Sequence, residues 1–126
     1  MCDFSHGFRV PEIVKERPVI VFKSSSRSKL VTVIPLSTVE PNPHENYHLL
    51  IPKKELPNIA YFNHKDSWLK GDMVYTVGWH RLSMIQIGRH NGKRQYYNTR
   101  ISLSLMTDME KCVLNGIGLN RLVKSV

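Results

Sequence analysis

Short runs of apolar and β-branched residues recur along the first half of the chain, separated by polar or proline-rich stretches. The runs at 18–22, 30–36 and 47–51 have the length and composition of buried strands. The polar, serine-rich stretch at 24–29 predicts a hairpin loop between the first two runs. Pro35 has no N–H to donate to a neighbouring strand, so we expect it at a sheet edge or a bulge.

The middle of the chain is less regular. Residues 39–45 contain two prolines and predict an exposed loop, and residues 53–65 show few periodic cues. The run at 68–77 predicts one or two strands with a kink at Gly71, and residues 81–87 predict a further strand. Many short strands at this spacing favour a small β-barrel over an alternating βαβ sheet.

The last element is predicted to be a helix. Thr107 and Glu110 fit a capping box, in which each side chain bonds the backbone N–H of the other. Apolar residues follow at helical spacing, and Asn115-Gly116 supplies a stop signal. We therefore predict a mainly β (α+β) domain that spans residues 1–126 and ends in a helix.

Composition narrows the class of partner. The 126 residues are 41% hydrophobic, which indicates a folded protein. There are 18 Lys+Arg against 10 Asp+Glu, a formal charge of +8. So large an excess on a small body favours an anionic partner, most often nucleic acid, although a merely soluble basic surface has the same composition.

Cysteine usage and hydropathy suggest the compartment. Cys2 and Cys112 show no metal-ligand spacing, so we expect free thiols, no zinc and no cofactor, with Cys112 in the core. No secretion signal opens the chain, and no apolar run approaches the ~20 residues that a membrane span needs. We expect a cytoplasmic protein that does not enter the membrane.

The common catalytic signatures are absent, and the acidic residues are too scattered for a metal-dependent nuclease. His44 and His48 are four residues apart but straddle a loop and a strand, which disfavours a metal pair. RNA cleavage needs less, because the 2′-hydroxyl of RNA attacks its own phosphate once that group is aligned and its charge stabilised. An arginine and a hydroxyl side chain suit that task.

Arg17 and Ser37-Thr38 are candidates for that pair. Arg17 immediately precedes the strand predicted at 18–22, and Ser37-Thr38 follow the strand at 30–36. If the two strands form a hairpin, these residues lie at the same open end. The alternative is a solvated arginine and two ordinary turn formers.

Three blocks of the sequence resemble, in order, the MazF/PemK family of toxin ribonucleases: residues 11–21, 33–38 and 70–77. The resemblance covers nearly the whole chain. It implies an SH3-like small β-barrel (PemK/MazF/CcdB-like) with a C-terminal α-helix, which forms a homodimer. It also implies metal-independent, sequence-selective cleavage of single-stranded mRNA to a 2′,3′-cyclic phosphate and a 5′-hydroxyl, restrained by an acidic-tailed antitoxin protein.

The resemblance assigns catalytic roles to four residues. Arg17 matches the family's catalytic arginine, which acts on the scissile phosphate. Ser37 stands where relatives usually have the first threonine of a hydroxyl pair, and Thr38 matches the second. Asp72 matches an aspartate that is a candidate for proton transfer or base recognition.

Other residues are assigned to RNA binding. Glu12 matches an acidic residue in the loop before the arginine, and Lys15 lies in the same loop. Lys70 stands where PemK-like members often have an arginine, and lysine keeps the charge without the bidentate fork. Trp68 and Trp79 are expected in the core or at a dimer interface rather than as stacking platforms.

A basic turn is a further candidate RNA contact. Arg89, Lys93 and Arg94 flank an Asn-Gly turn at 91–92 and could grip phosphates, and one of the tyrosines at 96–97 could stack on a base. The alternative is a solvated hairpin tip whose tyrosines pack on the barrel.

Two departures from the family pattern limit the transfer. Relatives usually begin several residues earlier, so the first strand, at 2–4, is expected to be short. The loop at 5–15 lacks the family's Glu-Gln-Gly stretch, so the RNA sequence preference is not transferred. A non-catalytic toxin of the same fold, as in gyrase poisons of the CcdB type, and an inactive RNA-binding barrel remain alternatives.

Overall fold

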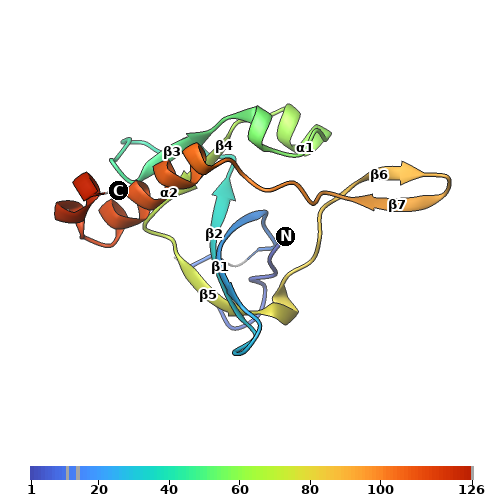
Figure 1. The fold of residues 1–126 in the computed structure, drawn as a ribbon, viewed down its shortest axis with the longest axis horizontal. Coiled ribbons are helices and arrows are strands. Elements are labelled where there is room, and N and C mark those ends of the chain that lie inside the picture. Colours follow the sequence, from blue (N-terminus) through green and yellow to red (C-terminus); the bar gives the residue numbers. More distant parts are fainter. Residues whose placement is uncertain (11, 14, 126) are drawn as a thin grey trace.

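The computed structural model describes residues 1–10, 12–13 and 15–125 (Figure 1). Its main sheet has five antiparallel strands, in the order β1-β2-β4-β3 with β5 also paired to β2. The strands are β1 (Val19–Ser25), β2 (Leu30–Ser37), β3 (His48–Ile51), β4 (Ser67–Lys70) and β5 (Tyr75–Gly78). The helices are α1 (Ala60–Asn63) and α2 (Leu103–Gly116), with 3-10 turns at Lys53–Glu55, Trp79–Arg81 and Asn120–Ser125. None of the helices described is long and apolar enough to cross a membrane.

Strand β2 is the centre of the sheet, and Pro35 lies inside it. One side of β2 pairs with β1, while the other pairs first with β5, up to Val33, and then with β4, from Leu36. Pro35 falls between those two partners, where no N–H is needed. The prediction that Pro35 lies at a sheet edge or a bulge is therefore wrong. The point where a strand changes its partner also leaves a backbone N–H without a role, and so it tolerates proline as well.

Two hydrophobic clusters lie against this sheet. One packs α2 on the sheet around Ile34, Leu69 and Met109, and it includes the predicted core residue Cys112. The other surrounds Phe4 and includes Cys2. Both cysteines are free thiols, as predicted, and burial raises the pKa of each thiol.

The predicted class, mainly β with a C-terminal helix, is confirmed. Around the second cluster, the described residues form two single bridges, in which Cys2 pairs with Arg17 on one side and with Leu82 on the other. These bridges connect the residues just before β1 to the segment after β5. Strand β5 in turn pairs with β2. The predicted first strand is thus reduced to one bridging residue.

The start of the helix was predicted too late. Its N-cap is Ser102, whose hydroxyl oxygen accepts from the Leu105 N–H at 3.2 Å. The Ser102 amide donates to the Glu55 carboxylate at 3.0 Å, and its hydroxyl donates to the same group. Thr107 lies inside α2 and donates to the Leu103 carbonyl. The predicted stop is confirmed, since α2 ends at Gly116.

A second sheet is a two-stranded arm formed by β6 (Gln86–His90) and β7 (Lys93–Tyr96), and it extends away from the main sheet (Figure 1). The strand predicted at 81–87 begins only at Gln86, so that boundary was wrong. The turn is as predicted, with Asn91 at φ 51° and Gly92 at φ 77°. All nine strand residues of the arm are exposed.

Gly71 is required by a close approach rather than by a simple kink. A Cβ at Gly71 would lie 2.2 Å from the carbonyl oxygen of Cys112 in α2. A Cβ at Gly116 would likewise lie 2.5 Å from the Asp72 amide nitrogen. The turn after β4 is thereby pressed onto the last turns of α2.

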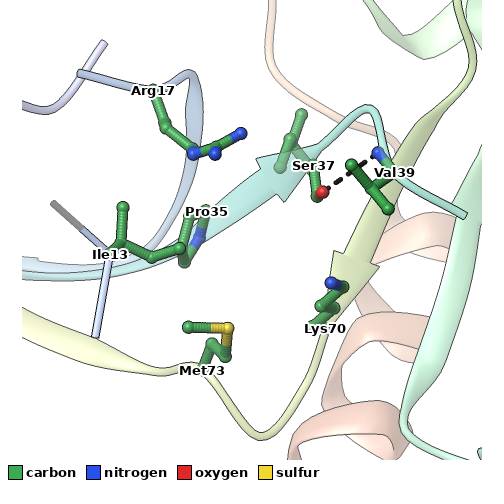
Figure 2. A pocket seen from close by; sticks show the side chains of 8 residues that line it. Ile13, Arg17, Pro35, Ser37, Val39, Lys70 and Met73 are labelled. Atoms are coloured by element: carbon green, nitrogen blue, oxygen red, sulfur yellow. Dashed lines mark hydrogen bonds between the residues drawn. The ribbon is translucent and has the colours of Figure 1, made fainter. Parts of the chain in front are cut away.

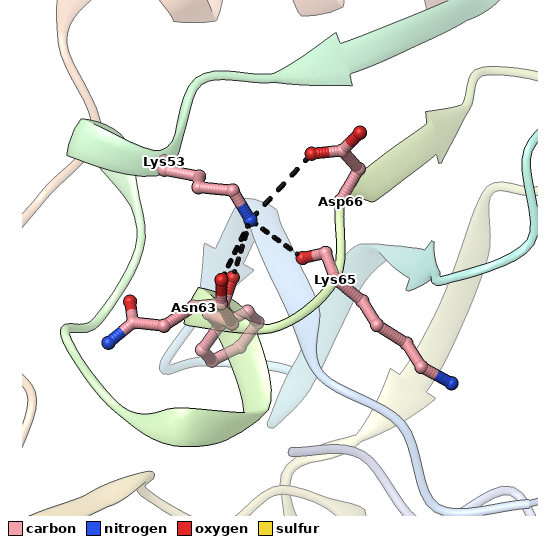
Figure 3. A network of polar contacts seen from close by, with 5 residues as sticks. Lys53, Asn63, Lys65 and Asp66 are labelled. Carbon is pink, nitrogen blue, oxygen red and sulfur yellow. Dashed lines mark hydrogen bonds and ion pairs between the residues drawn. The ribbon is translucent and has the colours of Figure 1, made fainter.

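Lys53 holds the segment between β3 and β4 together (Figure 3). Its Nζ donates to the carbonyls of Phe62 at 3.0 Å, Asn63 at 3.4 Å and Lys65 at 3.0 Å, and forms an ion pair with Asp66 at 3.7 Å. These carbonyls belong to the end of α1 and the residues just after it. The lysine thus serves as a C-terminal cap for this short helix.

Candidate active site

A pocket of about 220 Å³ opens at the end of β2, between the start of β1 and the end of β4 (Figure 2). Arg17, Ser37 and Lys70 supply its polar side chains. The remaining lining residues are Ile13, Pro35, Leu36, Val39 and Met73. The described lining thus combines two cations and a hydroxyl with no carboxylate, which suits an anionic group.

The register of the first hairpin explains why Arg17 and Ser37 meet. Val19 pairs with Pro35, and the Leu36 amide donates to the Pro18 carbonyl at 2.9 Å. Two residues beyond the first pair, Arg17 lies opposite Ser37. The predicted convergence of these two residues at one end of the hairpin is confirmed.

Arg17 has an anchored backbone and an unsatisfied side chain. Its amide and carbonyl bond the carbonyl and amide of Cys2 at 3.0 and 2.8 Å. Within the described part of the chain, its Nε is buried without a hydrogen-bond partner. The guanidinium points across the pocket toward Ser37 (Figure 2). A buried donor without a partner carries a free-energy cost that a bound anion would remove.

Ser37 is oriented by the chain that follows it. Its Oγ accepts a hydrogen bond from the Val39 N–H at 3.1 Å. This local turn occupies an acceptor site of the oxygen and leaves the hydroxyl hydrogen to be donated. The side chain is therefore held in place as a donor at the pocket wall.

Lys70 reaches the pocket from β4. Ser37 pairs with Trp68, and Lys70 lies two residues after Trp68, so Lys70 is on the face that carries Ser37. The Lys70 carbonyl accepts from the Met73 N–H at 3.0 Å, which tightens the turn beyond it. The second positive charge of the pocket thus stands on the last residue of β4, whereas the first lies two residues before β1.

Thr38 and Asp72 do not line this pocket. Thr38 is half-buried in the bend that follows β2, and its side chain is not part of the pocket lining. Asp72 is exposed in the turn after Lys70, close enough to Tyr47 and His48 to affect both. Burial, with a smaller contribution from the Asp72 carboxylate, raises the pKa of Tyr47. The pKa of His48 is lowered overall by burial, and the Asp72 carboxylate partly opposes that shift.

The residues predicted to bind RNA fall into separate regions. Glu12 and Lys15 are exposed beside the pocket residue Ile13, whose amide donates to the Tyr75 hydroxyl at 3.1 Å. A carboxylate oxygen of Glu12 accepts from the Arg9 amide at 2.9 Å. The three cations of the basic turn lie on the projecting arm and do not line the pocket: Arg89, Lys93 and Arg94.

Sequence reasoning missed the apolar wall of the pocket. Val39 reaches the pocket through the bend after β2, in which its N–H bonds the Ser37 Oγ, so strand alternation could not have predicted it. The positions of Met73 and Ile13 in the pocket wall could not be predicted either, because both residues lie in segments outside the strands. Trp68 is not in the core, since it lies outside both buried clusters and is half-buried on the pocket's face of the sheet; its place at a dimer interface stays a prediction.

Fold and site together define a small β-rich protein with a cationic, hydroxyl-bearing pocket. Residues 1–112 match the model of the family described as PemK-like, MazF-like toxin of type II toxin-antitoxin system. The chain therefore belongs to this toxin family.

Two individual proteins are similar to it. YifN of Escherichia coli strain K12, an uncharacterised protein, is 27% identical over 109 residues, covering 85% of this chain and 70% of its own length. The solved structure of Mycobacterium tuberculosis toxin MazF-mt6 matches with a TM-score of 0.55 at 16% identity, over 86% of this chain and 92% of that one. The latter likeness supports the fold alone.

Proposed function

We propose that this toxin is a metal-independent endoribonuclease that cleaves single-stranded mRNA in the cytoplasm. One observation carries the proposal: Arg17, whose Nε is buried without a hydrogen-bond partner among the described residues, and the Ser37 hydroxyl line one pocket. Family membership supports it, because the chain is a toxin and the described lining of its pocket, with two cations and no carboxylate, suits an anionic target.

The proposed reaction is an internal transesterification. The 2′-oxygen of one nucleotide attacks the adjacent phosphorus and loses its proton, while the bond to the 5′-oxygen of the next nucleotide breaks and that oxygen gains a proton. The products are a 2′,3′-cyclic phosphate and a 5′-hydroxyl. Arg17 donates to the equatorial phosphate oxygens as negative charge grows, and Ser37 donates its hydroxyl hydrogen to the same group.

Lys70 adds a positive charge to the pocket, and its single ammonium attracts the phosphate without the planar fork of arginine. Thr38 and Asp72 keep their proposed roles as hydroxyl partner and as proton-transfer or base-recognition group. Both stand outside the lining of the pocket, so Arg17 and Ser37 carry the account.

Two surfaces suit the protein partners that we propose, an antitoxin and a second copy of the chain. An acidic antitoxin tail suits a pocket whose described lining has two cations and no carboxylate. A homodimer suits a second hollow of about 670 Å³, lined largely by apolar side chains at β1 and the base of the arm. Val21, Met84 and Leu103 line it and are 46%, 60% and 86% exposed, so a second copy would bury considerable apolar surface.

The nuclease proposal is tested by incubating the purified chain with a long single-stranded RNA in excess EDTA. We expect cleavage, with products ending in a cyclic phosphate and a 5′-hydroxyl. Arg17→Ala should cut at least about 100-fold more slowly, the usual cost of losing one donor to a developing oxyanion. A well-folded wild type that leaves the RNA intact, or equal cutting by both proteins, contradicts the proposal. Intact but salt-sensitively bound RNA would instead identify an inactive binding protein.

A further inference from the structure

The sheet face that carries the pocket continues beyond it. Arg17 and Ser37 line the pocket together, Ser37 pairs with Trp68, and Trp68 pairs with Leu50 of β3. Directly opposed residues point to the same face of an antiparallel sheet and lie about 5 Å apart at Cβ. Trp68 is therefore next to Ser37 in one row across the sheet, on the side away from Arg17.

The surface around Trp68 differs in kind from the phosphate pocket. Along β4, Ser67 and Leu69 are buried while Trp68 and Lys70 face outward and are half-buried. Leu50, the partner of Trp68 on β3, is 43% exposed, and Val39, whose N–H bonds the adjacent Ser37, is 65% exposed. A flat aromatic group flanked by exposed aliphatic side chains suits a nucleobase better than a second phosphate.

The loop between β2 and β3 supplies a second side to this surface. The His44 ring meets the Trp68 ring edge to face, with centroids 5.0 Å apart and planes at 81°. Glu40 holds His44 through Oε1 and Nε2 at 3.1 Å. The Glu40 carboxylate, 68% exposed, is thus placed beside the aromatic pair.

We propose that Trp68 is a stacking subsite for a nucleobase next to the scissile phosphate, with the His44–Glu40 pair at its edge. This inference rests on the proposed function, because the phosphate in the Arg17–Ser37 pocket sets the position of the base. Stacking tolerates any base, whereas the carboxylate favours one that presents N–H groups. A base can donate N–H groups to this carboxylate, whereas an ionised acidic side chain only accepts, which favours RNA over an antitoxin tail as the occupant.

Binding of a non-cleavable ligand tests the subsite apart from catalysis. The probe is a single-stranded oligonucleotide of randomised sequence with 2′-O-methyl groups throughout, which removes the attacking hydroxyl. Trp68→Leu keeps apolar volume but lacks a π-face, and Trp68→Phe keeps one. Trp79→Leu is the matched control, because Trp79 is 39% exposed at the other end of β2, near Lys29.

We expect Trp68→Leu to weaken oligonucleotide binding by about 5- to 100-fold, the cost of losing one stacked base. Trp68→Phe should recover most of the affinity, and Trp79→Leu should bind as the wild type does. In Trp79→Phe, where Trp68 is the only tryptophan, the oligonucleotide should quench fluorescence, and inorganic polyphosphate, which has no bases, should not.

The subsite is refuted if Trp68→Leu binds the oligonucleotide as the wild type does, or if polyphosphate quenches Trp68 equally. It is also refuted if polyglutamate alone quenches Trp68, or if Trp68→Leu turns a dimer into a monomer in sedimentation, since Trp68 would then serve a protein partner. The two proposals fail separately. Quenching without cleavage of ordinary RNA removes the nuclease alone, and cleavage that Trp68→Leu leaves unchanged in rate and affinity removes the subsite alone.

Discussion

The pocket and the projecting arm both gather positive charge, but the chain supports that charge in opposite ways. Lys70 stands on β4, and Arg17 lies just before β1, where its backbone is bridged to Cys2. Within the described part of the chain, the Arg17 Nε is buried without a hydrogen-bond partner. On the arm, Arg89 lies directly opposite Arg94 and His90 opposite Lys93, all exposed on a two-stranded ribbon. Fixed, desolvated charge can stabilise a transition state, whereas exposed charge mainly attracts a polyanion.

The difference between the pocket and the arm is tested most strongly by a substitution that keeps the positive charge at Arg17 but removes the planar guanidinium. Arg17→Lys should lower the single-turnover cleavage rate about 100-fold, because an ammonium cannot donate in a bidentate fork. Arg94→Lys, the matched change on the arm, should leave that rate unchanged. Rapid-quench measurements at saturating RNA check both, and equal losses in the two variants would remove the distinction.

Removing the positive charges of the arm should weaken RNA binding and leave the cleavage rate of bound RNA unchanged. With Arg89, Lys93 and Arg94 all changed to Gln, binding should weaken about 10- to 100-fold at moderate salt. The slope of log affinity against log salt should fall by about 2, at ~0.7 for each lost phosphate contact with a single strand. A control with Arg27, Lys54 and Lys65 changed to Gln has the same net charge and should keep the wild-type slope. A control that loses the same slope would show that net charge alone matters.

The pocket and the arm should also differ in how much the glycine next to each contributes to the stability of the fold. Gly71→Ala should lower the free energy of unfolding by about 1–3 kcal/mol, because the new Cβ meets the Cys112 carbonyl of α2. Gly92→Asn should change it little, since asparagine tolerates φ 77° and nothing lies near an added Cβ. Urea unfolding of both variants measures the difference. A tolerated Gly71→Ala would show that the turn beside Lys70 is not pressed onto α2.

Glu55 connects the arm to the core, and its contribution should depend on pH. The Tyr97 hydroxyl donates to the Glu55 carbonyl at 3.4 Å, and hydrogen bonds from the Ser102 hydroxyl and amide lower the pKa of the Glu55 carboxyl. A lowered folded-state pKa contributes stability that is present above the unfolded value, about 4.3, and lost as pH falls through the folded value. Thermal unfolding should therefore show wild type and Glu55→Gln converging below about pH 4.

Loss of the helix cap is the smallest effect expected. Ser102→Ala should cost about 1 kcal/mol of unfolding free energy at neutral pH, the usual value for an N-cap serine. Thr107→Ala, at the cap predicted from sequence, should cost less, because Thr107 lies inside α2. Chemical denaturation compares the two, and the reverse order would restore the predicted start of the helix.

The features predicted correctly are those that neighbouring residues specify. The apolar runs predict β1 and β2, and their hairpin register brings Arg17 to Ser37 without distant contacts. The Asn91-Gly92 turn is local in the same sense. By contrast, the start of α2 depends on Glu55, 47 residues before Ser102, while a local capping box pointed to Thr107. The packing of Gly71 against α2 and the position of Trp68 likewise depend on how the elements assemble.

The most direct test of the account compares three proteins on one RNA at saturating concentration: the wild type, Arg17→Ala, and the arm variant with Arg89, Lys93 and Arg94 changed to Gln. The measured quantity is the single-turnover rate constant of cleavage in excess EDTA. We predict a fall of at least about 100-fold for Arg17→Ala and a rate for the arm variant equal to that of the wild type. A folded Arg17→Ala that cuts normally while the arm variant is inactive would contradict the claim that the chemistry takes place in the pocket.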